Sequence, residues 1–299
     1  MQLKGIIPAM LTPLTVEQKV NESVTRQLTN HLLDSGVHGL FILGTNGEFH
    51  LLNTEEKIGF AKTVIEETKG RVPVIVGTGG NSTEETIELS QKMEQLGADA
   101  LSLITPFFIS PTQEEMAVHF TKVAESISLP VLLYNIPART GVNLEPETVA
   151  RLAKVPNIVG IKDSSGSFDN IEKYINATKD EDFSVFAGTD SLILQTLQAG
   201  GKGAVAATAN MVPDVVVAIY DSWLAGNIEA AEENQVKLEP LRNTFKHGTL
   251  PSVLKKAVEL YSVPVGPPKM PVSEISGDAL EIVSKMVEKY KQQKASITN

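Results

Sequence analysis

Short apolar runs alternate with amphipathic helical patterns about eight times along the chain, and this alternation restricts the possible fold more than any other feature. The runs are rich in β-branched residues and end in glycine or polar clusters, as buried parallel strands do. Several helical patterns open on capping sequences such as Asn53-Thr54-Glu55-Glu56 and Ser82-Thr83-Glu84-Glu85. The alternation predicts an α/β fold, a (β/α)8 TIM barrel with a C-terminal helical appendage.

The alternative is a doubly wound open sheet, which also alternates strands and helices. No Gly-x-Gly-x-x-Gly follows the first apolar run, and no phosphate-loop lysine motif is present. The barrel is therefore favoured over a nucleotide-binding sheet.

The strand pattern stops near Gly226, and only helices are expected beyond it. We predict a barrel catalytic domain over residues 1–226 and a helical region packed on it over 227–299. Strands are expected over residues 5–11, 39–43, 72–76, 100–104, 130–133, 158–161, 183–187 and 203–207, and the C-terminal helices over 228–241, 251–261 and 277–291.

Composition excludes several classes of function. The 299 residues carry a net charge of -10 with scattered charges, so no basic stripe for nucleic acid is present. The absence of cysteine excludes disulfides, thiolate catalysis and cysteine metal sites. No apolar run approaches the roughly 18 residues of a membrane span, and the N-terminus lacks a signal-peptide layout. We expect a cytoplasmic protein without membrane or nucleic-acid partners.

Lys162 directly follows the buried run Ile158–Ile161. Burial disfavours a charged ammonium, so two interpretations are open. The lysine either reaches solvent or pairs with Asp163, or it is a nucleophile that forms a Schiff base with a carbonyl.

Other polar residues follow the strands where a barrel places its active site. The Gly44–Glu48 loop offers backbone N–H groups and the Thr45 hydroxyl to a small carboxylate, although it could be an ordinary turn. Gly77–Gly80 gives the same signal more weakly. Tyr134 is either a proton relay or a buried phenol, and Arg139 binds either a carboxylate or a surface acid.

The five histidines show no metal-ligand spacing, and only His50 lies near the C-terminal end of a strand. The serines lack a nucleophile-elbow motif. Lys162, Tyr134 and Thr45 end three different strands, so they can meet at the barrel mouth and act on a small keto acid without a metal or cofactor.

The chain resembles the pyruvate-dependent class I aldolases and lyases that include dihydrodipicolinate synthase and N-acetylneuraminate lyase. The resemblance spans nearly the whole chain, and it is carried by the Gly44–Glu48 loop, by Tyr134–Gly141 and by Gly160-Ile161-Lys162-Asp163. It implies that Lys162 forms a Schiff base with pyruvate, that Tyr134 relays protons, and that Thr45 holds the pyruvate carboxylate and contacts the tyrosine. The family is usually a homotetramer, a dimer of dimers.

The resemblance also implies binding residues. Asn46 stands where the synthases usually carry a second threonine, and its backbone N–H can contact substrate. Arg139 matches an arginine that binds the second substrate's carboxylate. The carbonyl of Val205 matches a substrate contact, while Gly188 and Asp190 match residues that line the pocket.

Phe107-Phe108 departs from the synthase pattern, which carries a tyrosine pair whose second member relays protons in a neighbouring subunit. Phenylalanine has no hydroxyl to do so. The favoured hypothesis is therefore a lyase or aldolase that joins or separates pyruvate and an aldehyde in a 2-keto-3-deoxy sugar acid or 4-hydroxy-2-oxo acid. The alternatives are 4-hydroxy-tetrahydrodipicolinate synthase, acting on pyruvate and aspartate semialdehyde, and a non-catalytic keto-acid sensor.

Overall fold

The computed structural model describes residues 3–298 and places eight parallel strands in one sheet. The order along the sheet is β1-β8-β7-β6-β5-β4-β3-β2. A parallel bridge between Ala9 and Phe41 joins the two outer strands of this order, and the Met10 N–H donates to the Phe41 carbonyl over 2.8 Å. The sheet thus closes on itself, which confirms the predicted (β/α)8 barrel. The strands are β1 (Gly5–Pro8), β2 (Leu40–Ile42), β3 (Val74–Gly77), β4 (Ala100–Ile104), β5 (Val131–Asn135), β6 (Ile158–Asp163), β7 (Ser184–Ala187) and β8 (Gly203–Ala206).

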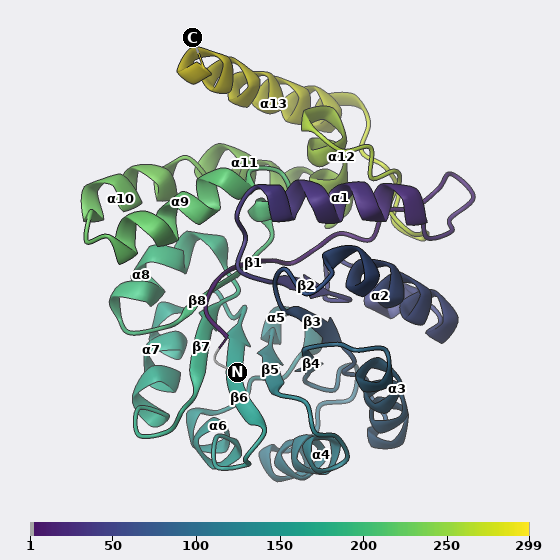
Figure 1. Ribbon diagram of the computed structural model, residues 1–299, viewed down its shortest axis with the longest axis vertical. Coiled ribbons are helices and arrows are strands. Elements are labelled where there is room, and N and C mark those ends of the chain that lie inside the picture. The colour runs from purple at the N-terminus through teal and green to yellow at the C-terminus, as the bar shows by residue number, and fades with distance from the viewer. Residues whose placement is uncertain (1–2, 299) are drawn as a thin grey trace.

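Helices surround the strands, and α13 carries the C-terminus outside this ring (Figure 1). Within residues 3–298, no helix is long and apolar enough to cross a membrane. The α-helices are α1 (Glu22–Asp34), α2 (Thr54–Thr68), α3 (Thr83–Gln95), α4 (Gln113–Glu125), α5 (Pro137–Thr140), α6 (Pro146–Leu152), α7 (Phe168–Ala177), α8 (Ile193–Gln198), α9 (Pro213–Leu224), α10 (Ile228–Val236), α11 (Glu239–Thr244), α12 (Ser252–Tyr261) and α13 (Gly277–Thr298). Four 3-10 helices accompany them: η1 (Phe49–Leu51), η2 (Asp190–Leu192), η3 (Thr208–Asn210) and η4 (Phe245–His247).

Side-chain caps set the starts of the helices that the sequence predicts best. The side chains of Asn53 and Thr112 each accept from the backbone N–H three residues on. The side chains of Glu56 and Glu115 accept in turn from the backbone N–H groups of Asn53 and Thr112, so α2 and α4 begin in capping boxes. The sequence signal was reliable here because a cap needs only neighbouring residues.

The C-terminal helices differ in part from the prediction. The single helix expected over 228–241 is two helices, α10 and α11, because Pro240 lacks a backbone N–H and is tolerated only in a first turn. The four residues of α5 were not predicted, since a helix this short shows no periodicity. The boundary at 226/227 falls between α9 and α10, and the division into two regions stays a prediction.

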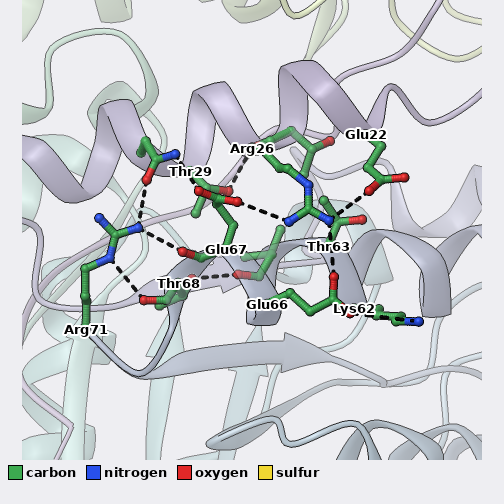
Figure 2. Close-up of polar contacts among 12 residues, drawn as sticks. Glu22, Arg26, Thr29, Lys62, Thr63, Glu66, Glu67, Thr68 and Arg71 are labelled. Atoms are coloured by element: carbon green, nitrogen blue, oxygen red, sulfur yellow. Dashed lines mark hydrogen bonds and ion pairs between the residues drawn. The ribbon is translucent and has the colours of Figure 1, made fainter.

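A polar network joins α1 to α2 (Figure 2). The Arg26 guanidinium bonds to Glu22 at 2.8 Å and to Glu66 and Glu67 at 3.1 Å. These three carboxylates raise the pKa of Arg26. The contacts lie toward solvent, where individual ion pairs add little stability, so their main effect is to fix the orientation of two helices.

The segment between α12 and α13, residues 262–276, is the C-terminal connector, and it lies against the segment that follows β1. The Leu14 N–H donates to the Val265 carbonyl over 3.0 Å, beside Gly266 at φ +74°. A Cβ at Gly266 would lie 2.0 Å from the Leu14 carbonyl oxygen, so only glycine allows this approach. The connector is thereby packed against the barrel.

Candidate active site

Lys162 lies on β6 and is 3 % exposed. Its neighbours in register are Tyr134 on β5 and Phe186 on β7. Its Nζ lies 3.9 Å from the centre of the Tyr134 ring and 4.5 Å from the centre of the Phe41 ring. The amine is therefore held between aromatic rings inside the barrel.

Asp163 does not pair with Lys162. Successive strand residues face opposite sides, and the Asp163 carboxylate accepts bonds from Asn135 (2.8 Å), Asn170 (3.0 Å) and the Ser165 hydroxyl. Burial raises the pKa of Asp163, and these bonds oppose the rise. The interpretation of Lys162 as a surface lysine or as a partner of Asp163 is wrong, and its role as a nucleophile stays a prediction.

Tyr134 and Thr45 meet at the ends of β5 and β2. Their hydroxyl oxygens lie 3.0 Å apart, so the two side chains share a hydrogen bond. Tyr134 is buried and also bears Lys162 on its ring face. The structure thus brings together all three residues that were predicted to be catalytic; their roles stay a prediction.

A cavity of about 520 Å³ opens beside these residues. Six of the predicted site residues line it: Thr45, Asn46, Tyr134, Arg139, Gly188 and Asp190. The Lys162 side chain is not among the lining residues, and its Nζ lies over the Tyr134 ring. The volume is ample for pyruvate together with a small aldehyde.

Gly188 and Asp190 shape the cavity wall after β7. A Cβ at Gly188 would lie 2.1 Å from the Ser164 hydroxyl oxygen, so the close approach requires glycine. The buried Asp190 carboxylate accepts from the backbone N–H groups of Ala207 (3.2 Å) and Thr208 (2.6 Å). Asp190 therefore holds the turn after β8, which reduces its freedom to bind substrate.

Val205 is not brought to the cavity. It lies buried in β8 beside Ile7, and Ala207 of the following turn lines the cavity instead. A substrate contact through the Val205 carbonyl stays a prediction.

Arg139 and His50 lie at the wall of the cavity. Arg139 is exposed on α5, and no ion pair of its guanidinium occurs within residues 3–298, so it is free for an anion. The pKa of His50 is lowered mainly by burial; Lys57 and Arg139 lower it further, and Glu48 opposes them. The sequence placed His50 near a strand end, and the structure confirms that position.

The phenylalanine pair divides between cavity and solvent. Phe107 lines the cavity and meets the Phe49 ring edge-to-face, with 6.1 Å between ring centres. Phe108 has φ 77° and is 90 % exposed, and Ile109 beside it is also exposed. The Phe108 ring is exposed and has no hydroxyl, so it cannot pass a proton to Tyr134 of the same chain.

Part of the wall comes from the C-terminal region and was not predicted. These residues lie in or near α11 and η4 or in the connector: Arg242, Phe245, Thr249, Leu250 and Val272. No local pattern marks them, because they reach the barrel mouth only when the end of the chain folds back over it. Among them, Arg242 adds a second guanidinium to that of Arg139.

The described residues contain no group of three or more His, Asp or Glu placed to hold a metal ion. The side chains at or beside the cavity include the Lys162 amine, the Thr45 and Tyr134 hydroxyls and the guanidinium groups of Arg139 and Arg242. Such groups can form an imine, move a proton and bind a carboxylate.

Comparisons with known proteins agree with this geometry. Residues 2–290 match the model of the dihydrodipicolinate synthetase family. A 4-hydroxy-tetrahydrodipicolinate synthase of Methanopyrus kandleri is 41% identical over 290 residues, with 96% of each chain covered. Another, from Halalkalibacterium halodurans, is 42% identical and covers 93% of this chain and 94% of its own.

Solved structures show the same similarity. YagE, a prophage protein of E. coli K12 determined in complex with pyruvate, has a TM-score of 0.94 and 34% identity, covering 97% of this chain and 99% of its own. A dihydrodipicolinate synthase from Thermotoga maritima has a TM-score of 0.94 and 32% identity, with the same coverage. The chain therefore belongs to the dihydrodipicolinate synthetase family, and it is an enzyme of the class I aldolase and lyase type.

Proposed function

We propose that Lys162 forms a Schiff base with pyruvate. The observation that carries the proposal is a buried amine between aromatic rings, beside a tyrosine–threonine pair at one cavity. The amine attacks the keto carbon, and loss of water gives an iminium. The iminium accepts the electron pair left when C3 loses a proton, so an enamine forms. Carbon C3 of the enamine then attacks the aldehyde carbon, and water finally releases the product from Lys162.

Tyr134 is suited to move the protons in these steps. Its hydroxyl lies 3.0 Å from that of Thr45 and borders the cavity. We assign to it three transfers: the hydroxyl gives a proton to the departing water, the resulting phenolate takes the proton that C3 loses, and the hydroxyl then gives that proton to the new alkoxide. Thr45 and Asn46 line the cavity, and we assign to the Thr45 hydroxyl and the Asn46 backbone N–H the binding of the pyruvate carboxylate.

The reaction best supported is that of 4-hydroxy-tetrahydrodipicolinate synthase, the condensation of pyruvate with aspartate semialdehyde. Relatives about 40% identical over nearly the whole chain carry that name. Arg139, free of an ion pair within residues 3–298, is suited to the carboxylate of the semialdehyde.

A second candidate is aldol cleavage of a 2-keto-3-deoxy sugar acid or 4-hydroxy-2-oxo acid. The observation that favours it is Phe108, which has no hydroxyl with which to relay protons from a neighbouring subunit. In the cleavage direction the substrate's own hydroxyl supplies the proton that Tyr134 must accept. The sequence led us to prefer this candidate, and the named relatives now favour the synthase.

The two reactions are separated by comparing kcat/KM. One assay measures condensation of pyruvate with aspartate semialdehyde, and the other measures pyruvate release from gluconate, galactonate and glucarate derivatives of 2-keto-3-deoxy acids. A higher value for condensation supports the synthase, and a higher value for any cleavage reaction supports the second candidate. Binding of pyruvate without turnover in either assay would indicate the keto-acid sensor.

The same proposal extends to the surroundings of the enzyme. We expect a homo-oligomer, a dimer of dimers as is usual in the family, and a cytoplasmic location. Support for an interface comes from the exposed apolar residues Phe108 and Ile109, which follow the cavity-lining Phe107 in the chain. Light scattering of the purified chain tests the assembly.

A further inference from the structure

A buried ion pair joins the Gly44–Glu48 loop to the C-terminal region. The Glu48 carboxylate and the Lys255 ammonium lie 2.6 Å apart, with 0% and 1% of their side chains exposed. Glu48 ends the loop that carries Thr45, and Lys255 lies on α12. Charges this deeply buried are rare unless they are paired, so the contact is a built feature of the fold.

Both partners have further hydrogen bonds to the C-terminal connector. Glu48 accepts from the Lys269 backbone N–H over 2.6 Å, and Lys255 donates to the Pro267 carbonyl over 2.8 Å. The Lys269 side chain bonds in turn to the Gln18 carbonyl (2.9 Å) and to the Glu56 carboxylate on α2. The connector is thus hydrogen-bonded to the loop that carries Thr45, to Gln18 and to α2.

The loop has a conformation that needs such support. Glu48 has φ 56°, a left-handed conformation that is costly for a residue with a side chain. Its N–H donates to the Thr45 carbonyl over 3.1 Å, and the Gly47 carbonyl accepts from Thr12 over 2.7 Å. These bonds close a tight turn whose orientation sets where the Thr45 hydroxyl and the nearby backbone N–H groups point.

We infer that Glu48 and Lys255 are positioning residues for substrate: their ion pair fixes the turn that receives the carboxylate of the keto acid. The inference rests on the proposed function, since it assigns that carboxylate to Thr45 and Asn46. The pair acts through the turn, because neither charged group lines the cavity. The two charges neutralise each other. The electrostatic field at the carboxylate site therefore comes from the backbone N–H groups and the Thr45 hydroxyl.

The ion pair also gives the helical C-terminal region a role at the barrel, because Lys255 lies on α12 of that region. Burial lowers the pKa of Lys255, and Glu48 opposes that shift, so the ammonium depends on the carboxylate beside it for its charged form. Removing the lysine would leave the carboxylate buried without its counter-ion. The turn would then rearrange to bring Glu48 toward water, and Thr45 would move with it.

The test compares two ketones that differ in the carboxylate. Wild type and variants are incubated with pyruvate or with acetone in the presence of borohydride, and the rate of adduct formation on Lys162 is measured by peptide mass spectrometry. The variant is Lys255→Met, which keeps the length of the stem and removes the charge. The matched control is Lys256→Met, because Lys256 is the next residue of α12 and pairs with Glu259 and Glu274 nearer the surface.

We expect Lys255→Met to trap pyruvate about 10²-fold more slowly, as a displaced binding group does. Its rate with acetone should stay within about threefold of wild type, because acetone makes no use of the turn. A loss of local folding around Lys162 would slow both ketones equally, and that result would overturn the inference. An unchanged pyruvate rate would also overturn it, and Lys256→Met should behave as wild type with both ketones.

A second variant covers failure of Lys255→Met to fold. Glu48→Gln combined with Lys255→Met removes both charges, so no uncompensated ion is buried. This pair of changes should preserve folding and still lower the pyruvate-to-acetone ratio of trapping rates; an unchanged ratio would argue against positioning by the ion pair. Failure of the proposed function is seen separately, as an absence of any pyruvate adduct on Lys162 in the wild type.

Discussion

Two lysines are buried in this molecule, and their surroundings differ. Lys255, at the junction of the Gly44–Glu48 loop with α12, has a carboxylate at 2.6 Å and a carbonyl at 2.8 Å. Lys162, inside the barrel, lies over the rings of Tyr134 and Phe41 and forms no ion pair within residues 3–298. The Lys255 amine has two acceptors, and the Lys162 amine has no ion-pair partner within residues 3–298.

The difference separates a structural lysine from a reactive one. An ammonium that is paired and hydrogen-bonded gains little by leaving its partners, and its lone pair is not available for bonding to carbon. An amine without an acid beside it can offer that lone pair to a carbonyl. If Lys162 is the nucleophile that we propose, the fold forgoes the stability of a second buried ion pair for chemistry, as functional sites commonly do.

The largest effect is expected from Lys162→Met. Turnover should fall by about 10⁴-fold or more, because the covalent step is lost. Stability should be unchanged or raised, since no partner is left unpaired. Steady-state kinetics and urea unfolding measure the two effects, with Lys173→Met on the exposed face of α7 as the control. Retained turnover in Lys162→Met would remove the lysine from the mechanism.

Tyr134→Phe tests the groups around the reactive amine. We expect kcat to fall by about 10²–10⁴-fold, the usual share of general acid–base catalysis. The pyruvate adduct on Lys162 should still form, though more slowly, because the nucleophile is intact. Borohydride trapping beside steady-state assays measures both; a kcat within threefold of wild type would show that another group moves the proton.

Lys255→Met tests the structural lysine. We expect the free energy of unfolding to fall by about 3–5 kcal/mol, because a buried carboxylate loses its partner. Lys256→Met, which breaks partly exposed pairs, should cost about 1 kcal/mol or less. Urea denaturation followed by circular dichroism compares them, and equal losses in the two variants would contradict the distinction between buried and exposed pairs.

The sequence predicts the reactive side of this comparison, because the residues around Lys162 form local patterns. The run Ile158–Ile161 and the lysine after it are consecutive, so a buried strand with an amine at its end could be predicted. Thr45 and Tyr134 also follow apolar runs, and the barrel rule places such ends at one mouth.

The structural lysine could not be predicted in this way. Glu48 and Lys255 lie far apart in the chain, and nothing near Lys255 in the sequence distinguishes it from Lys256, which lies closer to the surface. The same holds for Arg242, which reaches the cavity from α11. Contacts that form only when the C-terminal region folds back over the barrel leave no periodic signal.

Phe108→Tyr should have a smaller effect, confined to the reactive side of the comparison. Its ring is 90 % exposed, so an added hydroxyl should leave stability unchanged. If a neighbouring subunit's Phe108 approaches Tyr134, the hydroxyl restores a relay. We then expect the ratio of kcat/KM for condensation to that for cleavage to rise by about tenfold, at the low end of a general-acid contribution. An unchanged ratio would show that proton transfer does not depend on this position.

The smallest effect concerns His119, another base buried without an acid. It lies on α4 with Nδ1 2.9 Å from the Thr83 hydroxyl oxygen, and burial lowers its pKa from the ordinary 6.5. The unfolded chain therefore binds a proton below pH 6.5 that the folded chain resists. The stability associated with this side chain is present above pH 6.5 and is lost as the pH falls toward the folded-state pKa.

His119→Gln keeps a hydrogen-bonding side chain and removes the titration. Between pH 6.5 and pH 5, the free energy of unfolding of wild type should fall more than that of the variant, because only the wild type carries this lowered pKa. Urea denaturation at several pH values gives both slopes, and parallel slopes would mean that His119 accepts a proton as readily in the fold as in the unfolded chain. A steeper slope in wild type would extend the comparison to a third buried base. Lys255 has an acid beside it, His119 has only the Thr83 hydroxyl while burial lowers its pKa, and Lys162 has no ion-pair partner within residues 3–298, in keeping with the nucleophilic role that we propose for it.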